Sequence, residues 1–307
     1  LVAGYSFSDD GIMGVRNVTI SDGVSNSQLY VFGLSTTQLL AEKQDTSNNR
    51  LSEFTRDGNG RVTEIRHPDL TRTQFVYDGR GNITLMTRVP KPGGSPPPNI
   101  VTSATYPGSC THATSCNKPT STTDARGFTT DYTYYTGHGG IEKIEQPAPS
   151  GSAPYGSGAR PRMDFTYGTV SGVTRLTKTT MCPTANTCSG TVQEAVGDFT
   201  YDAQARLEEV VRRAGDHPTT PSVKSEAEIE YRPQGDVVTI NGPLSGAADT
   251  TTFAYDEMRR LRAVIGPDPD GSGGGNPLQH KVTRLTYNAD GQVTLMEIGH
   301  VGSPASW

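Results

Sequence analysis

The stretch FTYDAQARLEEVVRRAGD, residues 199–216, recurs with variations along the chain. Close relatives read FVYDGRGNITLM at 75–86, FAYDEMRRLRAVIGPD at 253–268 and LTYNADGQVTLMEIG at 285–299. Seven copies carry an apolar or aromatic residue two positions before a tyrosine, and these tyrosines are Tyr77, Tyr134, Tyr167, Tyr201, Tyr231, Tyr255 and Tyr287. Because residues two apart share one face of a strand, each copy predicts a β-strand with both side chains on the same side.

The residues after the tyrosine predict a tight turn. In four copies the next residue is Asp or Asn, at Asp78, Asp202, Asp256 and Asn288. Such a side chain accepts hydrogen bonds from the backbone of the turn and ends the strand. Four positions past the tyrosine stands Gly81, Gly235 or Gly291, and glycine readily takes the positive φ of a hairpin loop. Ala205 and Arg259 hold this place in two copies, where either the left-handed conformation costs more or the turn type differs. A second alternating apolar run follows, so the unit is a β-hairpin.

The spacing of the copies predicts one long sheet. From Tyr134 onward the tyrosines recur every 24 to 34 residues, and a degenerate copy fits near Tyr106. Insertions rich in Pro, Gly and Ser explain the unequal steps; they read VPKPGGSPPPNI, QPAPSGSAPYGSGAR, AGDHPTTPSVKS and GPDPDGSGGGNPLQH. Hairpins set side by side continue each other's ladders and bury a shared face. We therefore expect an all-β fold of stacked antiparallel hairpin repeats in a continuous curved sheet, either a partial β-shell or a spiral.

The motif Y-D-x-x-G-R before an alternating strand, together with PTSTTDARGFTTDYTY at 119–134, resembles the YD-repeat proteins, also called rearrangement-hotspot (Rhs) proteins. The likeness runs from about Arg50 to about Gly299. It implies a bacterial protein whose sheet ribbon winds into a hollow shell that encloses a toxic C-terminal polypeptide or displays a surface for cell contact. The family's closing DPxGR-type region has no counterpart before Trp307, so we expect a segment of a longer protein or a member without cargo. Residues 1–50 are expected to be a β segment of degenerate repeats, and 51–307 the YD-repeat array.

Composition agrees with a single sheet. A hydrophobic content of 33%, with 35 Gly and 21 Pro, is thin for two compact cores, whereas a sheet with one solvated face needs less apolar surface. No run approaches the roughly 18 apolar residues of a membrane span. The net charge is −5 and basic runs are absent, so we expect no nucleic-acid partner.

The four cysteines form two pairs of equal spacing, CTHATSC with Cys110 and Cys116, and CPTANTC with Cys182 and Cys188. Local pairing is the simplest of the three connectivities. Free thiols remain an alternative, and so does zinc, although C-x5-C is not a usual zinc spacing. Disulfides imply an oxidising compartment, and we therefore expect a secreted, extracellular or cell-surface protein.

Catalytic motifs are missing from the sequence, which carries no G-x-S-x-G, H-E-x-x-H or P-loop. We expect no enzyme, no cofactor and no metal. The histidines fall mostly in loops, and the acidic loop at Asp268 and Asp270 lacks the order of an EF-hand, so plain turn chemistry is favoured there over calcium.

The tyrosine ladder has two interpretations, inward stacking between hairpins or an exposed aromatic platform for sugars. The function expected from the sequence is therefore a structural segment that encloses or displays other polypeptide, with recognition of cell-surface glycans as the alternative. Its expected partners are further repeats of the same polypeptide, copies of itself through edge strands, and an enclosed toxin or a glycan.

Overall fold

The computed structural model describes residues 4–10, 15–21, 27–33, 40–45, 50–148, 159–183, 188–215, 224–244, 246, 248–268 and 279–304. Internal contacts divide the chain into two units, Leu1–Gly140 and Ile141–Trp307. The sequence suggested a change of character near residue 50 instead, between a degenerate segment and the repeat array. The two units are described separately below.

The first unit is a run of antiparallel strands. They are β1 (Gly4–Asp10), β2 (Val15–Ser21), β3 (Ser27–Gly33), β4 (Leu40–Asp45), β5 (Arg50–Arg56), β6 (Val62–Arg66), β7 (Arg72–Tyr77), β8 (Ile83–Val89), β9 (Ile100–Thr105), β10 (Ser121–Thr123) and β11 (Thr129–Tyr134). Each strand pairs with the next in the chain. The segment expected to be β-structured, residues 1–50, holds β1 to β4.

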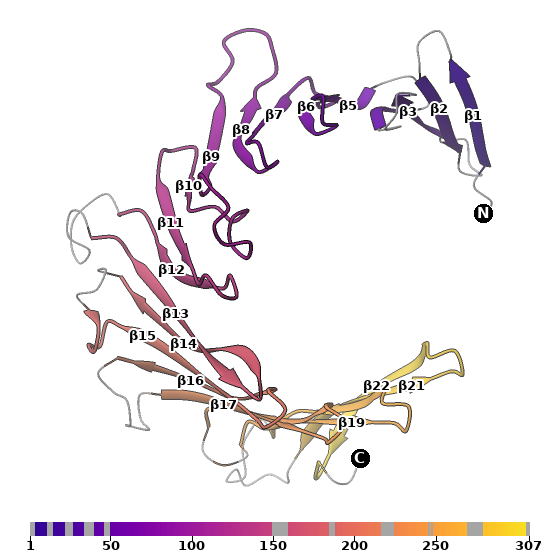
Figure 1. Ribbon diagram of the computed structural model, residues 1–307. Coiled ribbons are helices and arrows are strands. Elements are labelled where there is room, and N and C mark those ends of the chain that lie inside the picture. The colour runs from indigo at the N-terminus through magenta and orange to yellow at the C-terminus, as the bar shows by residue number, and fades with distance from the viewer. Residues whose placement is uncertain are drawn as a thin grey trace. The chain divides into compact units, whose positions relative to one another are not determined.

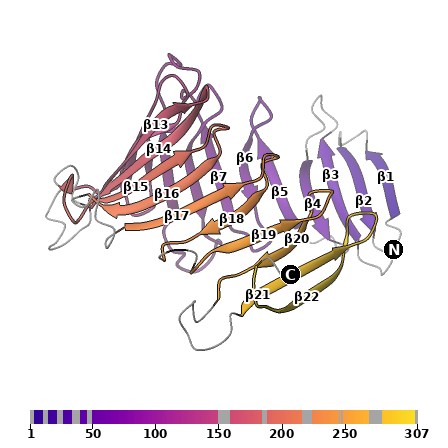
Figure 2. The same ribbon diagram turned by 90° about the horizontal axis from the view of Figure 1, so that it is seen from below.

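The second unit continues the same pattern within itself. Its strands are β12 (Ile141–Glu145), β13 (Arg162–Val170), β14 (Val173–Cys182), β15 (Ala195–Tyr201), β16 (Leu207–Ala214), β17 (Lys224–Tyr231), β18 (Val237–Asn241), β19 (Thr251–Tyr255), β20 (Leu261–Ile265), β21 (His280–Tyr287) and β22 (Val293–Val301). Each strand is again antiparallel to its successor. Within each unit, Figure 1 and Figure 2 show the strands lying beside their neighbours in chain order.

The prediction of an all-β fold built from stacked antiparallel hairpins is confirmed. The described residues contain no α-helix. Among them there is accordingly no helix long and apolar enough to cross a membrane.

The repeat tyrosines mark the ends of strands. Strands β7, β11, β15, β17, β19 and β21 end at Tyr77, Tyr134, Tyr201, Tyr231, Tyr255 and Tyr287. Tyr167 differs from this pattern, because β13 continues to Val170 and the chain turns at Ser171 and Gly172 instead. Ser171 and Gly172 have φ of 49° and 80°, so the strand extends until these residues with positive φ turn the chain.

The turns after Tyr77, Tyr201, Tyr231, Tyr255 and Tyr287 share one geometry, despite their different residues. Gly81, Gly235 and Gly291 have φ of 89°, 98° and 80°, and Ala205 and Arg259 take the same left-handed region at 59° and 64°. The turn type is therefore kept, and the two non-glycine residues accept its cost.

A β-bulge follows each of these five turns. Tyr77 pairs with Ile83 and Val76 with Leu85, so Thr84 is the extra residue of its strand. The same register shift occurs at Tyr201, Tyr231, Tyr255 and Tyr287. The Thr84 hydroxyl donates to the Val76 carbonyl at 3.3 Å, which gives the bulged residue a partner across the hairpin. Bulges of this kind bend and twist a strand locally.

The strand registers of the second unit assign its side chains to two faces. Phe199 lies opposite Val210, Phe253 opposite Val264 and Leu285 opposite Met296, all on one face. The other face carries both the ion pair of Arg213 with Asp198, at 2.9 Å, and the small buried core of Ala263, Ile265 and Val282. Most of the remaining apolar side chains are half-buried. Because so little is fully buried, contacts between neighbouring hairpins contribute much of what holds this sheet together.

Candidate functional site

The turn of each repeat hairpin is organised by its acidic residue. In the hairpin of β15 and β16, Asp202 Oδ1 accepts hydrogen bonds from the backbone N–H groups of Gln204 and Arg206, both at 2.9 Å. Asp202 Oδ2 accepts a third from Arg206 Nε at 2.6 Å. In the hairpin of β19 and β20, Asp256 bonds the backbone N–H of Arg260 at 2.8 Å and its Nε at 2.7 Å. The carboxylate therefore closes the turn and also orients the arginine four positions later.

That arginine reaches the next hairpin. Arg206 Nη1 donates to the carbonyl of Arg232 at 3.0 Å, and its guanidinium lies 4.5 Å from the centre of the Tyr231 ring. Arg260 makes the same two contacts with the following hairpin. Its Nη1 donates to the Asn288 carbonyl at 3.2 Å, and its guanidinium lies 4.6 Å from the centre of the Tyr287 ring. In the first unit, Arg61 bonds the Asp78 carbonyl at 3.1 Å and lies 4.8 Å from Tyr77. A cation over an aromatic face is attracted by the ring quadrupole.

The tyrosine completes the connection in the reverse direction. Its hydroxyl donates to a backbone carbonyl in or just before the second strand of the preceding hairpin. These bonds are Tyr77 to Val62, Tyr201 to Leu176, Tyr231 to Leu207 and Tyr287 to Leu261, each at 2.7 Å, and Tyr134 to Pro119 at 2.9 Å. We call the cation of one hairpin, the tyrosine of the next and the accepting carbonyl the joint.

The joint tolerates an exchange of charge. In the hairpin of β17 and β18, Arg232 stands where the two neighbouring hairpins have Asp202 and Asp256, and Asp236 stands where they have Arg206 and Arg260. The guanidinium of Arg232 nevertheless lies 5.2 Å from the Tyr255 ring. Asp236 accepts a bond from Arg259 Nη2 of the next hairpin at 2.8 Å. A cation on the following tyrosine is therefore retained, whichever of the two positions supplies it.

The turn carboxylates have lowered pKa values. For Asp78 the largest cause is the hydrogen bond from the Asn82 side chain, and for Asp256 it is the backbone N–H of Arg260. For Asp202, burial raises the pKa, but the hydrogen bonds from Arg206 outweigh it. Each of these groups therefore stays ionised at neutral pH, as its bonding to N–H donors requires.

The tyrosine ladder does not follow the expected stacking of ring on ring. The described contacts of Tyr77, Tyr231 and Tyr287 are with a guanidinium and a carbonyl of the preceding hairpin. The joint replaces ring stacking because the arginine, fixed by its carboxylate, occupies the face of the ring. Tyr167 lies within strand β13, three residues before its end, and not next to a turn.

The sequence reading missed two features of the joint. Arg61, Arg206 and Arg260 all stand four positions after an acid, and this regular spacing was the available signal. The hairpin of β5 and β6 was also missed, because Arg56 replaces tyrosine at the end of β5 while Asp57 still bonds Arg61 Nε at 2.7 Å.

Cys110, Cys116 and Cys188 lie in loops beside the sheet, and Cys182 is the last residue of β14. Cys110 is bonded to Cys116 and Cys182 to Cys188, with Cα atoms 4.8 and 5.7 Å apart. Cys116, Cys182 and Cys188 are buried. Each disulfide thus closes one short loop between consecutive strands.

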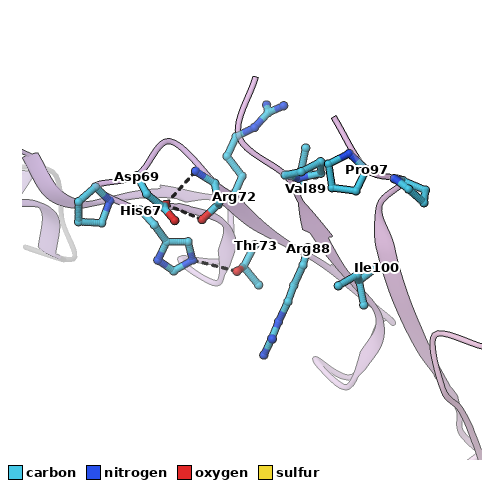
Figure 3. A pocket seen from close by; sticks show the side chains of 12 residues that line it. His67, Asp69, Arg72, Thr73, Arg88, Val89, Pro97 and Ile100 are labelled. Carbon is cyan, nitrogen blue, oxygen red and sulfur yellow. Dashed lines mark hydrogen bonds between the residues drawn. The ribbon is translucent and has the colours of Figure 1, made fainter. Parts of the chain in front are cut away.

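An open hollow of about 910 Å³ lies in the first unit, between the turn after β6 and the loop after β8. Its lining includes His67, whose Nε2 lies 3.0 Å from Thr73 Oγ1, and exposed Ile100. Figure 3 shows Arg88 directed away from Val89 and Pro97. No aromatic side chain is among its lining residues.

Glu209, Glu226 and Glu228 form an acidic group on β16 and β17, with ligand atoms within 4.8 Å of one another. Glu226 also pairs with Lys224. A hydrogen bond with Glu226 raises the pKa of Glu209 and is the largest cause of that shift, which fits a proton held between two neighbouring carboxyl groups. Exposed acidic groups of this kind are common without a metal ion. Asp270, in the acidic loop considered for calcium, lies outside the described residues.

Comparison with known proteins gives the fold a wider setting. No family model and no curated protein matches the chain. The crystal structures of TcdB2-TccC3-TEV and of TcdB2-TccC3 match 96% of this chain, with TM-scores of 0.64 and identities of 13% and 14%. The Photorhabdus luminescens Tc holotoxin pore with a mutated TccC3 matches 96% of it with a TM-score of 0.63 and 14% identity. This chain spans about 15% of the length of the chains it matches. At this identity the likeness shows that the fold is shared with segments of these toxin proteins.

Proposed function

We propose that the chain is a structural segment of a secreted or cell-surface bacterial protein, in which interlocked hairpins form a wall that encloses or displays other polypeptide. The joint carries this proposal. In the repeat hairpins that carry Asp and Arg, the Asp fixes the turn and orients the arginine of its own hairpin, whereas the arginine and the tyrosine make the contacts between hairpins. A motif used in this way supports a mechanical role rather than a reaction, so the proposal includes no catalysis and no cofactor.

Two further observations support the setting. The fold is shared with segments of toxin complexes, which agrees with the resemblance to YD-repeat proteins and with an enclosed toxic polypeptide as partner. The two local disulfides suit an oxidising compartment outside the cytoplasm. Further repeats of the same polypeptide are the other proposed partner.

Electron microscopy of the protein expressed from its complete gene tests the proposal. We expect sheet density bounding a lumen or an extended wall, with other polypeptide inside it or held on it. Limited proteolysis should leave any enclosed segment intact until the wall is unfolded. A compact globular particle in which the hairpin array is itself covered on both faces would contradict a wall.

Glycan recognition remains a second candidate through the hollow beside Ile100. Its prolines and exposed arginine offer contact, but the absence of an aromatic side chain in its lining removes the usual platform for a sugar ring. A glycan array decides between the two, because a wall segment gives no signal above background and a recognition module gives selective binding that Arg88→Gln abolishes.

A further inference from the structure

Strand β22 presents an unusual edge. It pairs with β21 and, among the described strands, with no other. Four of its large apolar side chains are half or more exposed: Val293 at 52%, Leu295 at 50%, Met296 at 59% and Ile298 at 62%. In β20, which has a neighbour on each side, Ala263 and Ile265 are fully buried. An exposed apolar edge strand is a template for pairing with another strand.

Strand β22 also carries half of a joint. Its first residue, Val293, corresponds to Leu207 and Leu261, whose carbonyls accept the hydroxyl of the next tyrosine. In the described part of the chain no tyrosine reaches the carbonyl of Val293. The position of the stacking arginine is held by Gln292, whose side chain accepts a bond from Asn288 Nδ2 at 3.1 Å.

We propose that the outer edge of β22 binds a further β-hairpin of the repeat type, with a tyrosine hydroxyl of that hairpin donated to the carbonyl of Val293. The inference rests on the proposed structural function, and it names the partner and the hydrogen bond that would hold it. Continuity with the preceding joints argues for this occupant. The first strand of the incoming hairpin would pair with β22 and cover Met296 and Ile298, as β21 pairs with β20. Since Gln292 carries no charge, this joint lacks the cation on the ring and is weaker than the joints built on Arg206 and Arg260.

The test appends a second copy of residues 266–301 to the end of the chain and follows amide hydrogen exchange in β22. We expect the outward-facing amides of Val293–Val301 to exchange at least about tenfold more slowly than in the parent chain, because the ladder now continues. Replacing the tyrosine of the appended copy by phenylalanine should reverse part of this protection. Gln292→Arg in the parent repeat should increase it several-fold, because it restores the cation.

The matched control appends the same residues in scrambled order and should leave the exchange of β22 unchanged. Unchanged exchange with the true copy, whether or not that copy folds, overturns the proposal, as does equal protection by the scrambled copy. If neither the phenylalanine change nor Gln292→Arg alters the protection, the strands pair without the tyrosine hydrogen bond. That result overturns the proposed bond to the carbonyl of Val293. None of these failures alters the result of microscopy on the whole protein, so the proposed function is judged separately.

Discussion

At the scale of single residues, the tyrosine hydroxyl has a role that the sequence pattern does not reveal. A period of two placed the ring on one face of a strand, but the hydrogen bond runs to a residue some 24 or 25 positions earlier, as from Tyr201 to Leu176 and from Tyr231 to Leu207. Such a contact depends on how hairpins are stacked. It therefore becomes visible only when the register between them is known.

Tyr201→Phe and Tyr231→Phe are each expected to lower the free energy of unfolding by about 1 kcal/mol, because a backbone carbonyl loses its partner. Tyr255→Phe is the matched control. Its ring lies against Arg232, but its hydroxyl makes no hydrogen bond within the described residues. Urea unfolding of the three variants decides, and an equal loss in all three would mean that the hydroxyl bond contributes nothing specific.

Gly291→Ala is expected to cost about 1 kcal/mol. Gly291 has φ of 80°, and an added Cβ would meet no atom within 4 Å, so the cost is one of backbone conformation alone. Gly79→Ala serves as the control, because that site is equally open and its φ is not in the left-handed region. Thermal unfolding should separate the two variants, and a neutral Gly291→Ala would remove the argument from the left-handed turn.

At the scale of the hairpin, the turn carboxylates link stability to pH. Their pKa values are lowered in the folded state from an ordinary value of 3.8. A lowered folded pKa gives stability that is present above the unfolded value and is lost as the pH falls through the folded one. We therefore expect the urea concentration at the midpoint of unfolding to decrease when the pH is lowered below about 4.

Asp256→Asn isolates this effect. The fourth turn of this type already uses an amide, since Asn288 Oδ1 accepts the backbone N–H of Gln292 at 2.8 Å. The variant should therefore keep its fold and show a smaller loss of stability between pH 7 and pH 3 than the parent chain. An unchanged pH profile would show that the Asp256 carboxylate is not linked to folding.

The exchanged pair in the hairpin of β17 and β18 offers a test by charge reversal. Arg232→Asp alone places two acids in one turn and removes the cation from Tyr255, so it should destabilise the chain. Asp236→Arg alone places two cations together. The double variant restores the order of the other hairpins and should be more stable than the sum of the single effects predicts, as a double-mutant cycle would measure. Strict additivity would mean that these positions do not act as a pair.

Hairpins were predictable from the sequence because their signals are local. Tyrosine, acid and glycine at fixed spacing define strand end, turn and left-handed residue, and β7, β15, β19 and β21 end where this pattern placed them. Tyr167 departs from the pattern because the first residues with positive φ after it are Ser171 and Gly172, so β13 runs on to Val170. The hairpin of β5 and β6 was missed because Arg56 stands in place of the tyrosine there. The arginine contacts join residues of different hairpins, for which a single sequence gives no direct signal.

At the scale of the whole molecule, the disulfides close loops rather than join hairpins into a sheet. Replacing Cys110 and Cys116 together by serine should lower the free energy of unfolding by roughly 2 kcal/mol at most, because the ring is short. The circular-dichroism spectrum should stay that of a β-protein. Loss of that spectrum on replacement would show that the bond is needed for folding itself.

Within each unit the joints lie at one end of the strands, whereas the described ends of β8, β12, β16 and β20, which the Pro/Gly-rich insertions of the sequence follow, lie at the other. Selection can therefore act on the two ends independently. Insertions can lengthen, shorten or change composition without touching a joint, and the joint itself asks only for a cation, a phenol and a carbonyl. Very different sequences can satisfy this requirement, which gives a physical reason why a chain that is 13% identical to its structural neighbours still has the same fold.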